Sequence, residues 1–236
     1  WATPPWHVKG AQGDNHWRYV DPLSLTAIRH NDGTLKAAYE RNLQAGRKVP
    51  APLYGRGFAF EGPDVPDSAY PDANTCDRAI NELCRLQDRP FFLAAGFIRP
   101  HLPFNAPKKY WDLYSPADIE LPSRNEWPEN MPPIAGSDWG ELRSYIGISP
   151  KGPVSESTLR MLIHGYYASV SYMDAQVGRL LAELDRLRLR ENTIVILWGD
   201  HGWKLGDYGA WCKHTNFEID TRVPLILSVP GQQHTG

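Results

Sequence analysis

A long amphipathic stretch, set among short apolar runs, limits what this chain can fold into. Residues 156–190 carry apolar side chains at helical spacing, and Ser155 can cap the start of such a helix. The stripe comprises Leu159, Ile163, Tyr166, Val170, Met173, Val177, Leu180, Leu184 and Leu187. Apolar runs at residues 91–97, 193–198 and 223–229 have the length and composition of strands buried in a sheet. Strands alternating with a long helix predict an α/β fold whose sheet is largely parallel and flanked by helices.

The rest of the chain is less regular. Residues 72–87 show helical spacing with Asp72 as the expected N-cap, and residues 34–44 can form a short helix. In residues 115–153, prolines at positions 116, 122, 128, 132 and 133 forbid long regular elements. We therefore expect one partial domain over residues 1–236, with residues 1–70 a variable irregular segment and residues 71–236 contributing the core.

Composition excludes several classes of protein. The chain has 236 residues, of which 42% are apolar, so it can build a packed core. A formal charge of −2 gives no electrostatic footprint for nucleic acid, and no apolar run is long enough to cross a bilayer. The chain opens at Trp1 without a secretory signal or an initiator Met, so it looks processed at its start and does not reveal its compartment.

Three cysteines are expected to remain free thiols. Cys76 and Cys84 are eight residues apart on one predicted helix, which separates them by roughly 12 Å along the axis. That separation is too large for a disulfide, which requires Cα atoms within about 7 Å. Cys212 could pair with either of them only through the fold.

Asp200 and His201 directly follow the apolar run at residues 193–198. In open α/β sheets, ligands bind beyond the carboxyl ends of the strands. The pair offers a cation one hard oxygen and one imidazole nitrogen, and the glycines on either side allow close backbone approach. Taken alone, such a pair serves equally well as a helix cap or a hydrogen-bonded turn. Its position favours a metal site.

Two further residues are candidates for the same edge of the sheet. Lys213 follows His201 by twelve residues, after a glycine-rich excursion, and could place a point charge on an anionic substrate oxygen. His101 lies between Pro100 and Pro103, whose rings fix the backbone around a preorganised hydrogen-bond donor. The alternatives are a solvated surface lysine and a hydrogen-bonded loop histidine.

These blocks resemble the sulfatase family. Residues 96–104 (Gly-Phe-Ile-Arg-Pro-His-Leu-Pro-Phe) look like the loop that presents a histidine to the sulfate. Residues 166–181 are similar to the long helix of iduronate-2-sulfatase-like and choline-sulfatase-like enzymes. Residues 199–206 together with residues 211–218 resemble their metal-and-lysine block. The resemblance is strong over residues 70–230 and weak before them.

The resemblance implies an alkaline-phosphatase-like fold and hydrolysis of a sulfate monoester. Asp200 and His201 would be metal ligands, Lys213 would neutralise sulfate charge, and His101 would hydrogen-bond the sulfate or the leaving oxygen. The implied cation is usually Ca²⁺, although a histidine ligand is unusual for Ca²⁺ and leaves Mg²⁺ or Mn²⁺ open. The implied substrate is a sulfated small molecule or glycan, in a periplasmic, lysosomal or secreted setting.

The family's formylglycine nucleophile has no counterpart in the sequence. Its motif is Cys or Ser, any residue, Pro or Ala, any residue, then Arg, whereas Cys76, Cys84 and Cys212 are followed by Asp-Arg-Ala, Arg-Leu-Gln and Lys-His-Thr. The hypothesis is that the nucleophile lies in a missing N-terminal part of the same domain, and that this polypeptide alone is inactive. The alternatives are a phosphate or phosphonate monoester hydrolase of the same superfamily and a non-catalytic carbohydrate-binding remnant.

Overall fold

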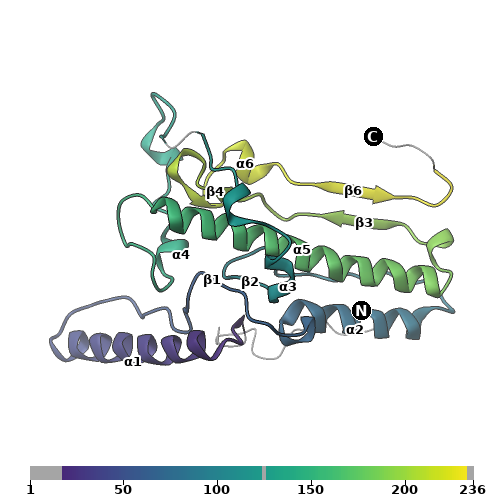
Figure 1. Ribbon diagram of the computed structural model, residues 1–236, viewed down its shortest axis with the longest axis horizontal. Coiled ribbons are helices and arrows are strands. Elements are labelled where there is room, and N and C mark those ends of the chain that lie inside the picture. The colour runs from purple at the N-terminus through teal and green to yellow at the C-terminus, as the bar shows by residue number, and fades with distance from the viewer. Residues whose placement is uncertain (1–17, 124–125, 233–236) are drawn as a thin grey trace.

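The computed structural model describes residues 18–123 and 126–232, shown in Figure 1. The helices and strands in chain order are α1 (Pro22–Gln44), β1 (Phe60–Glu61), α2 (Pro71–Leu86), β2 (Phe104–Asn105), α3 (Lys108–Trp111), α4 (Gly140–Arg143), α5 (Glu156–Arg186), β3 (Val195–Trp198), β4 (Lys204–Leu205), β5 (Trp211–Cys212), α6 (Glu218–Thr221) and β6 (Leu225–Ser228). No helix among the described residues combines the length and apolar character needed to cross a membrane.

Helix α5 is the central element, and its predicted start is confirmed. The Ser155 side chain accepts a hydrogen bond from the backbone N–H of Thr158. The predicted apolar stripe is only half-buried over most of its length, and the deepest face is offset from it, at residues such as Leu162, Ala168 and Tyr172. Ile163 and Leu184 of the stripe are buried, so the predicted stripe overlaps the buried face without coinciding with it, because the prediction counted apolar residues alone. Small residues and hydrogen-bonded polar residues occupy the face of α5 that packs most closely against its neighbours.

The close approach is between α5 and α2, and buried polar groups join the two helices. The Tyr172 hydroxyl accepts a hydrogen bond from Ala73 N and donates one to Asp67 O, each at 3.0 Å. The Gln176 amide donates to the Asp67 carboxylate, and the Cys76 thiol donates to the Gln176 carbonyl. Hydrogen bonds to these partners offset the cost of removing the polar atoms from water, so these residues can lie in the core.

Helix α2 begins one residue earlier than predicted, and the expected cap is wrong. Pro71 takes the first helical position after Tyr70, so Asp72 lies inside the first turn. Its two carboxylate oxygens instead accept hydrogen bonds from the backbone N–H groups of Ile98 and Arg99, both at 2.9 Å. Asp72 therefore anchors the segment that leads into His101.

Helix α1 is twice as long as the short helix expected at residues 34–44. It starts at Pro22, and the Asp21 side chain accepts a hydrogen bond from Leu23 N at 2.8 Å. Within α1 only Ser24 and Ile28 are buried, so the sequence shows little periodicity. The helix lies along the lower left of Figure 1.

The mixed α/β class is confirmed, and the described strands form three short pairs. β1 and β2 are parallel, whereas β3 pairs antiparallel with β6 and β4 pairs antiparallel with β5. Between β3 and β6 the chain forms β4, a short 3-10 turn, β5 and the four-residue helix α6, so no long helical crossover of the kind that parallel neighbours need connects them. All three cysteines are free, as expected.

The prediction that the apolar runs form buried strands is wrong for the described residues. Residues 91–97 form no strand, and Phe92 is 84% exposed. In the β3–β6 ribbon, at the upper side of Figure 1, Trp198 is 64% exposed and Leu225 62%. These apolar side chains remain open because no other described element covers them.

A buried ion pair closes the loop after β3. Lys204 and Asp220 are 0% and 3% exposed, and the lysine ammonium donates to Asp220 Oδ2 and to Thr215 Oγ1. Asp220 Oδ2 also accepts from the backbone N–H and the hydroxyl of Thr215. Residues 204–220 are thus tied together at their ends.

We expect Lys204→Met to lower the free energy of unfolding by about 3–5 kcal/mol, because it leaves the Asp220 carboxylate buried without a counter-charge. The matched control is Lys108→Met, which removes an exposed ion pair with Asp112 and should cost less than about 1 kcal/mol. Urea unfolding of both variants measures the difference. Equal decreases in the free energy of unfolding would show that the buried Lys204–Asp220 pair contributes no more to stability than the exposed pair.

Candidate functional site

Three of the four predicted site residues lie around one indole ring. His101 precedes β2, Lys213 follows β5, and His201 follows β3. The ring centroids of His101 and His201 lie 5.2 and 6.1 Å from that of Trp203, and Lys213 Nζ lies 4.6 Å from the same centroid. Trp203 is therefore the surface against which the two histidines and the lysine are assembled.

His101, Lys213 and Glu141 are in mutual contact. Lys213 Nζ lies 2.7 Å from His101 Nε2 and donates to Glu141 Oε2 at 3.0 Å. Glu141 Oε1 lies 3.2 Å from His101 Nε2, and His214 Nε2 lies 3.9 Å from Glu141 Oε2. Helix α4 supplies Glu141, so this short helix within an irregular stretch contributes a carboxylate to the site.

The electrostatics of this cluster keep His101 neutral and Glu141 charged. Burial lowers the pKa of His101 to about 4, and the Lys213 ammonium adds to the effect. Burial opposes ionisation of Glu141, but the hydrogen bond from Lys213 and the charge of its ammonium hold the pKa of Glu141 below the usual range. Nδ1–H of His101 donates to Leu102 O at 2.8 Å, which leaves Nε2 to accept from Lys213.

Buried contacts fix the backbone that presents His101. Arg99 is 4% exposed, and its guanidinium donates to the carbonyls of Asn105 and His101 at 2.9 and 3.0 Å. Arg18 Nη1 donates to Leu102 O at 3.1 Å. Donors from two separate parts of the chain therefore hold the carbonyls on either side of the imidazole.

Asp200 and His201 form an open pair beside this cluster. Asp200 is exposed, and its Oδ2 lies 3.6 Å from His201 Nε2. His201 Nδ1 contacts Gly202 O at 2.9 Å, so Nε2 faces the carboxylate with its lone pair available. A Cβ at Gly202 would lie 1.9 Å from Ile219 O, so only glycine fits this close approach.

The oxygen and nitrogen of this pair are suitable donors for a divalent cation. They are two donors only: no group of three or more His, Cys, Asp or Glu side chains gathers in a metal-binding arrangement within residues 18–123 and 126–232. Further ligands would have to complete the sphere.

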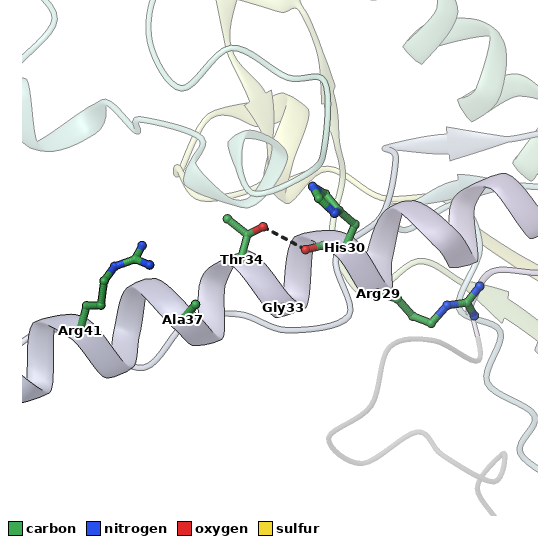
Figure 2. A pocket seen from close by; sticks show the side chains of 6 residues that line it. All are labelled: Arg29, His30, Gly33, Thr34, Ala37 and Arg41. Atoms are coloured by element: carbon green, nitrogen blue, oxygen red, sulfur yellow. Dashed lines mark hydrogen bonds between the residues drawn. The ribbon is translucent and has the colours of Figure 1, made fainter.

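Two surface hollows lie outside the cluster. Figure 2 shows the first, of about 490 Å³, whose lining residues all come from α1, among them Arg29, His30 and Arg41. It contains none of the predicted site residues. The second, of about 420 Å³, is lined by residues of the 115–153 stretch, such as Pro122, and of the loop at residues 204–220 (the lysine loop), such as Tyr208 and Phe217.

Sequence reasoning missed Glu141 and Trp203 as members of the site. Glu141 lies in a proline-rich stretch with no periodic signal, far from the other members in sequence. Trp203 lies two residues after His201, but an aromatic residue there is equally consistent with an ordinary core position.

The comparisons with known proteins agree on one family. The Sulfatase family model matches residues 18–235. Iduronate 2-sulfatase of Mus musculus is 43% identical over 240 residues, which cover 98% of this chain and 39% of that protein. Choline-sulfatase of Rhizobium meliloti is 33% identical over 144 residues, covering 61% of this chain and 27% of that protein.

A solved structure supports the same fold. The phosphonate monoester hydrolase from Silicibacter pomeroyi superposes with a TM-score of 0.59 at 25% identity, over 71% of this chain and 34% of that chain. The chain thus spans well under half the length of the relatives that it matches. The alkaline-phosphatase-like α/β fold and the family implied by the motifs are confirmed: this chain belongs to the sulfatase family.

Proposed function

We propose that the protein containing this chain hydrolyses sulfate monoesters. The observation that carries the proposal is the contact between Lys213 and His101, beside the Asp200–His201 pair, in a chain of the sulfatase family. An ammonium and an imidazole at one point provide a cation for an anionic oxygen and a hydrogen-bonding group for the leaving oxygen.

In this proposal each residue has a distinct role. Lys213 neutralises charge on the sulfate, and His101 hydrogen-bonds the sulfate or the leaving oxygen. Asp200 and His201 would hold a divalent cation, Ca²⁺ in the first instance, with Mg²⁺ or Mn²⁺ as alternatives. When bound, such a cation supplies Lewis-acid polarisation of an ester oxygen.

The nucleophile is proposed to be a formylglycine outside this chain. None of the three thiols is activated: burial raises the pKa of Cys212 to about 12 and that of Cys76 above its usual range. The pKa of Cys84 is raised mainly by its hydrogen bond to Glu183 and to a smaller extent by burial. The open β3–β6 ribbon is consistent with a further part of the same domain packing on it.

The substrate is proposed to be a sulfated small molecule or glycan. The hollow between the 115–153 stretch and the lysine loop supports a pocket wall built from these two segments. A periplasmic, lysosomal or secreted location is part of the same proposal. The structural match to a phosphonate monoester hydrolase favours one alternative, in which the same site acts on phosphate or phosphonate esters.

The substrate class is tested on the protein extended to include the proposed nucleophile. With 4-nitrophenyl sulfate we expect His101→Ala and Lys213→Ala each to lower kcat by about 100-fold or more, because each removes a group that stabilises developing charge. His30→Ala and Lys151→Ala, at exposed positions, are the matched controls. Preference for the phosphate ester of the same leaving group would favour the phosphohydrolase alternative, and turnover of neither would favour a binding remnant.

The chain of 236 residues alone is expected to show no formylglycine-dependent turnover. Hydrolysis of 4-nitrophenyl sulfate by this polypeptide, abolished by an aldehyde-blocking reagent, would place a nucleophile within it and contradict the proposal.

The metal role is tested by binding as well as activity. Asp200→Asn and His201→Ala should each raise the Kd for Ca²⁺ by at least about tenfold in isothermal titration, since each removes a donor or its charge. The control is Asp112→Asn, which changes an exposed carboxylate at the end of helix α3 and should leave the Kd unchanged. Unaltered Ca²⁺ affinity in the first two variants would mean that the cation binds elsewhere.

A further inference from the structure

Glu141 is an unexpected neighbour for a site that takes an anion. A carboxylate beside a sulfate-binding lysine repels the substrate, yet here it contacts both members of the proposed sulfate-binding pair. Its side chain is largely buried, so it is held within the cluster rather than extended into solvent. A group with this electrostatic cost needs a compensating role.

The hydrogen atoms available to the cluster suggest that role. With Nδ1–H directed at Leu102 O, His101 Nε2 is either an acceptor for Lys213 or, once protonated, a donor. It cannot accept from Lys213 and carry its own proton at the same time. While Lys213 stays in place, His101 is therefore neutral and has no proton to give to a leaving oxygen.

Departure of Lys213 changes this balance. When a sulfate oxygen draws the ammonium away, the nearest remaining partner of His101 Nε2 in the cluster is Glu141 Oε1, at 3.2 Å. A carboxylate at that distance favours an imidazolium, whose Nε2–H can donate to it.

We infer that Glu141 is a positioning residue that holds Lys213 and His101 before the substrate binds, and that favours protonated His101 once the sulfate has engaged Lys213. The inference rests on the proposed function, because it assumes that an anionic ester occupies this site. Substrate capture and charging of the proton donor are then coupled through one carboxylate.

The proton balance of the coupled step is simple. His101 Nε2 takes a proton from solvent as Lys213 moves to the sulfate. The nucleophile, an aldehyde hydrate in the proposed function, loses its hydroxyl proton to solvent and bonds to sulfur while the S–O bond to the leaving group breaks. The leaving oxygen keeps that electron pair and takes the proton from Nε2, which returns His101 to its neutral form.

The other charges that face His101 act in the opposite direction. Lys213 and Arg18 both disfavour its protonation, and Arg18 also holds Leu102 O. The Arg99 guanidinium donates to the His101 carbonyl rather than to the ring. His214 approaches Glu141 from the lysine loop and competes weakly for its charge. Glu141 is the group in this set that raises the pKa of His101.

The coupling is tested by NMR titration of His101, with the signal assigned by its loss in His101→Asn. Lys213→Met mimics departure of the ammonium and should raise the pKa of His101 by about one unit or more. Adding Glu141→Gln to this variant should reverse the rise in the pKa of His101. The matched control is Glu129→Gln, which removes an exposed carboxylate of the same stretch and should leave the rise unchanged. A His101 pKa that rises equally with and without Glu141 would overturn the inference.

Kinetics provide a second readout that a purely structural role would not produce. Proton donation matters for a poor leaving group, so Glu141→Gln should lower kcat/KM about 100-fold for an alkyl sulfate and less than about tenfold for 4-nitrophenyl sulfate. Glu141→Asp should recover part of the loss. Equal losses on both esters would contradict the positioning role. These assays use the protein extended to include the proposed nucleophile. If that protein without substitutions hydrolyses neither ester, the proposed function fails, and the NMR titration still decides the coupling.

Discussion

The contact between helices α2 and α5 is the interaction on which the rest of the structure depends. It brings Tyr172 and Gln176 into hydrogen bonds with backbone and side-chain groups at the start of α2. That placement fixes Asp72, whose carboxylate holds the backbone just before His101. The position of His101 therefore follows from helix packing some distance from it, through the first turn of α2 and the buried and half-buried hydrogen bonds on either side of it.

The site combines charges that would be costly if any one were removed. Lys204 and Asp220 neutralise each other in the core beneath the loop that carries Lys213. Above them, Lys213, His101 and Glu141 share one positive and one negative charge between three groups. The buried pair stabilises the loop, whereas in the upper cluster Glu141 contacts both Lys213 and His101 and therefore keeps one partner if the other is drawn away.

The sequence predicted helices α2 and α5 and the positions of β3 and β6 well, because period and capping are local properties. It did not predict that polar Tyr172 and Gln176 would face the core, since their partners lie about a hundred residues away. The start of α1 at Pro22 was missed because the helix buries almost none of its surface. Motifs placed His101, Asp200, His201 and Lys213 near one another, but Glu141 depends on a tertiary contact that no local pattern encodes.

The open β3–β6 ribbon has a consequence for metal binding. Asp200 and His201 lie immediately after β3, so the position of both donors depends on how firmly that strand is held. A strand covered on one side only, with its tryptophan in solvent, samples more conformations than one within a sheet. In the proposed metal site, cation affinity and sheet assembly would therefore be thermodynamically linked: whatever packs on the ribbon would lower the entropic cost of ordering Asp200 and His201, and a bound ion would in turn stabilise the assembled sheet.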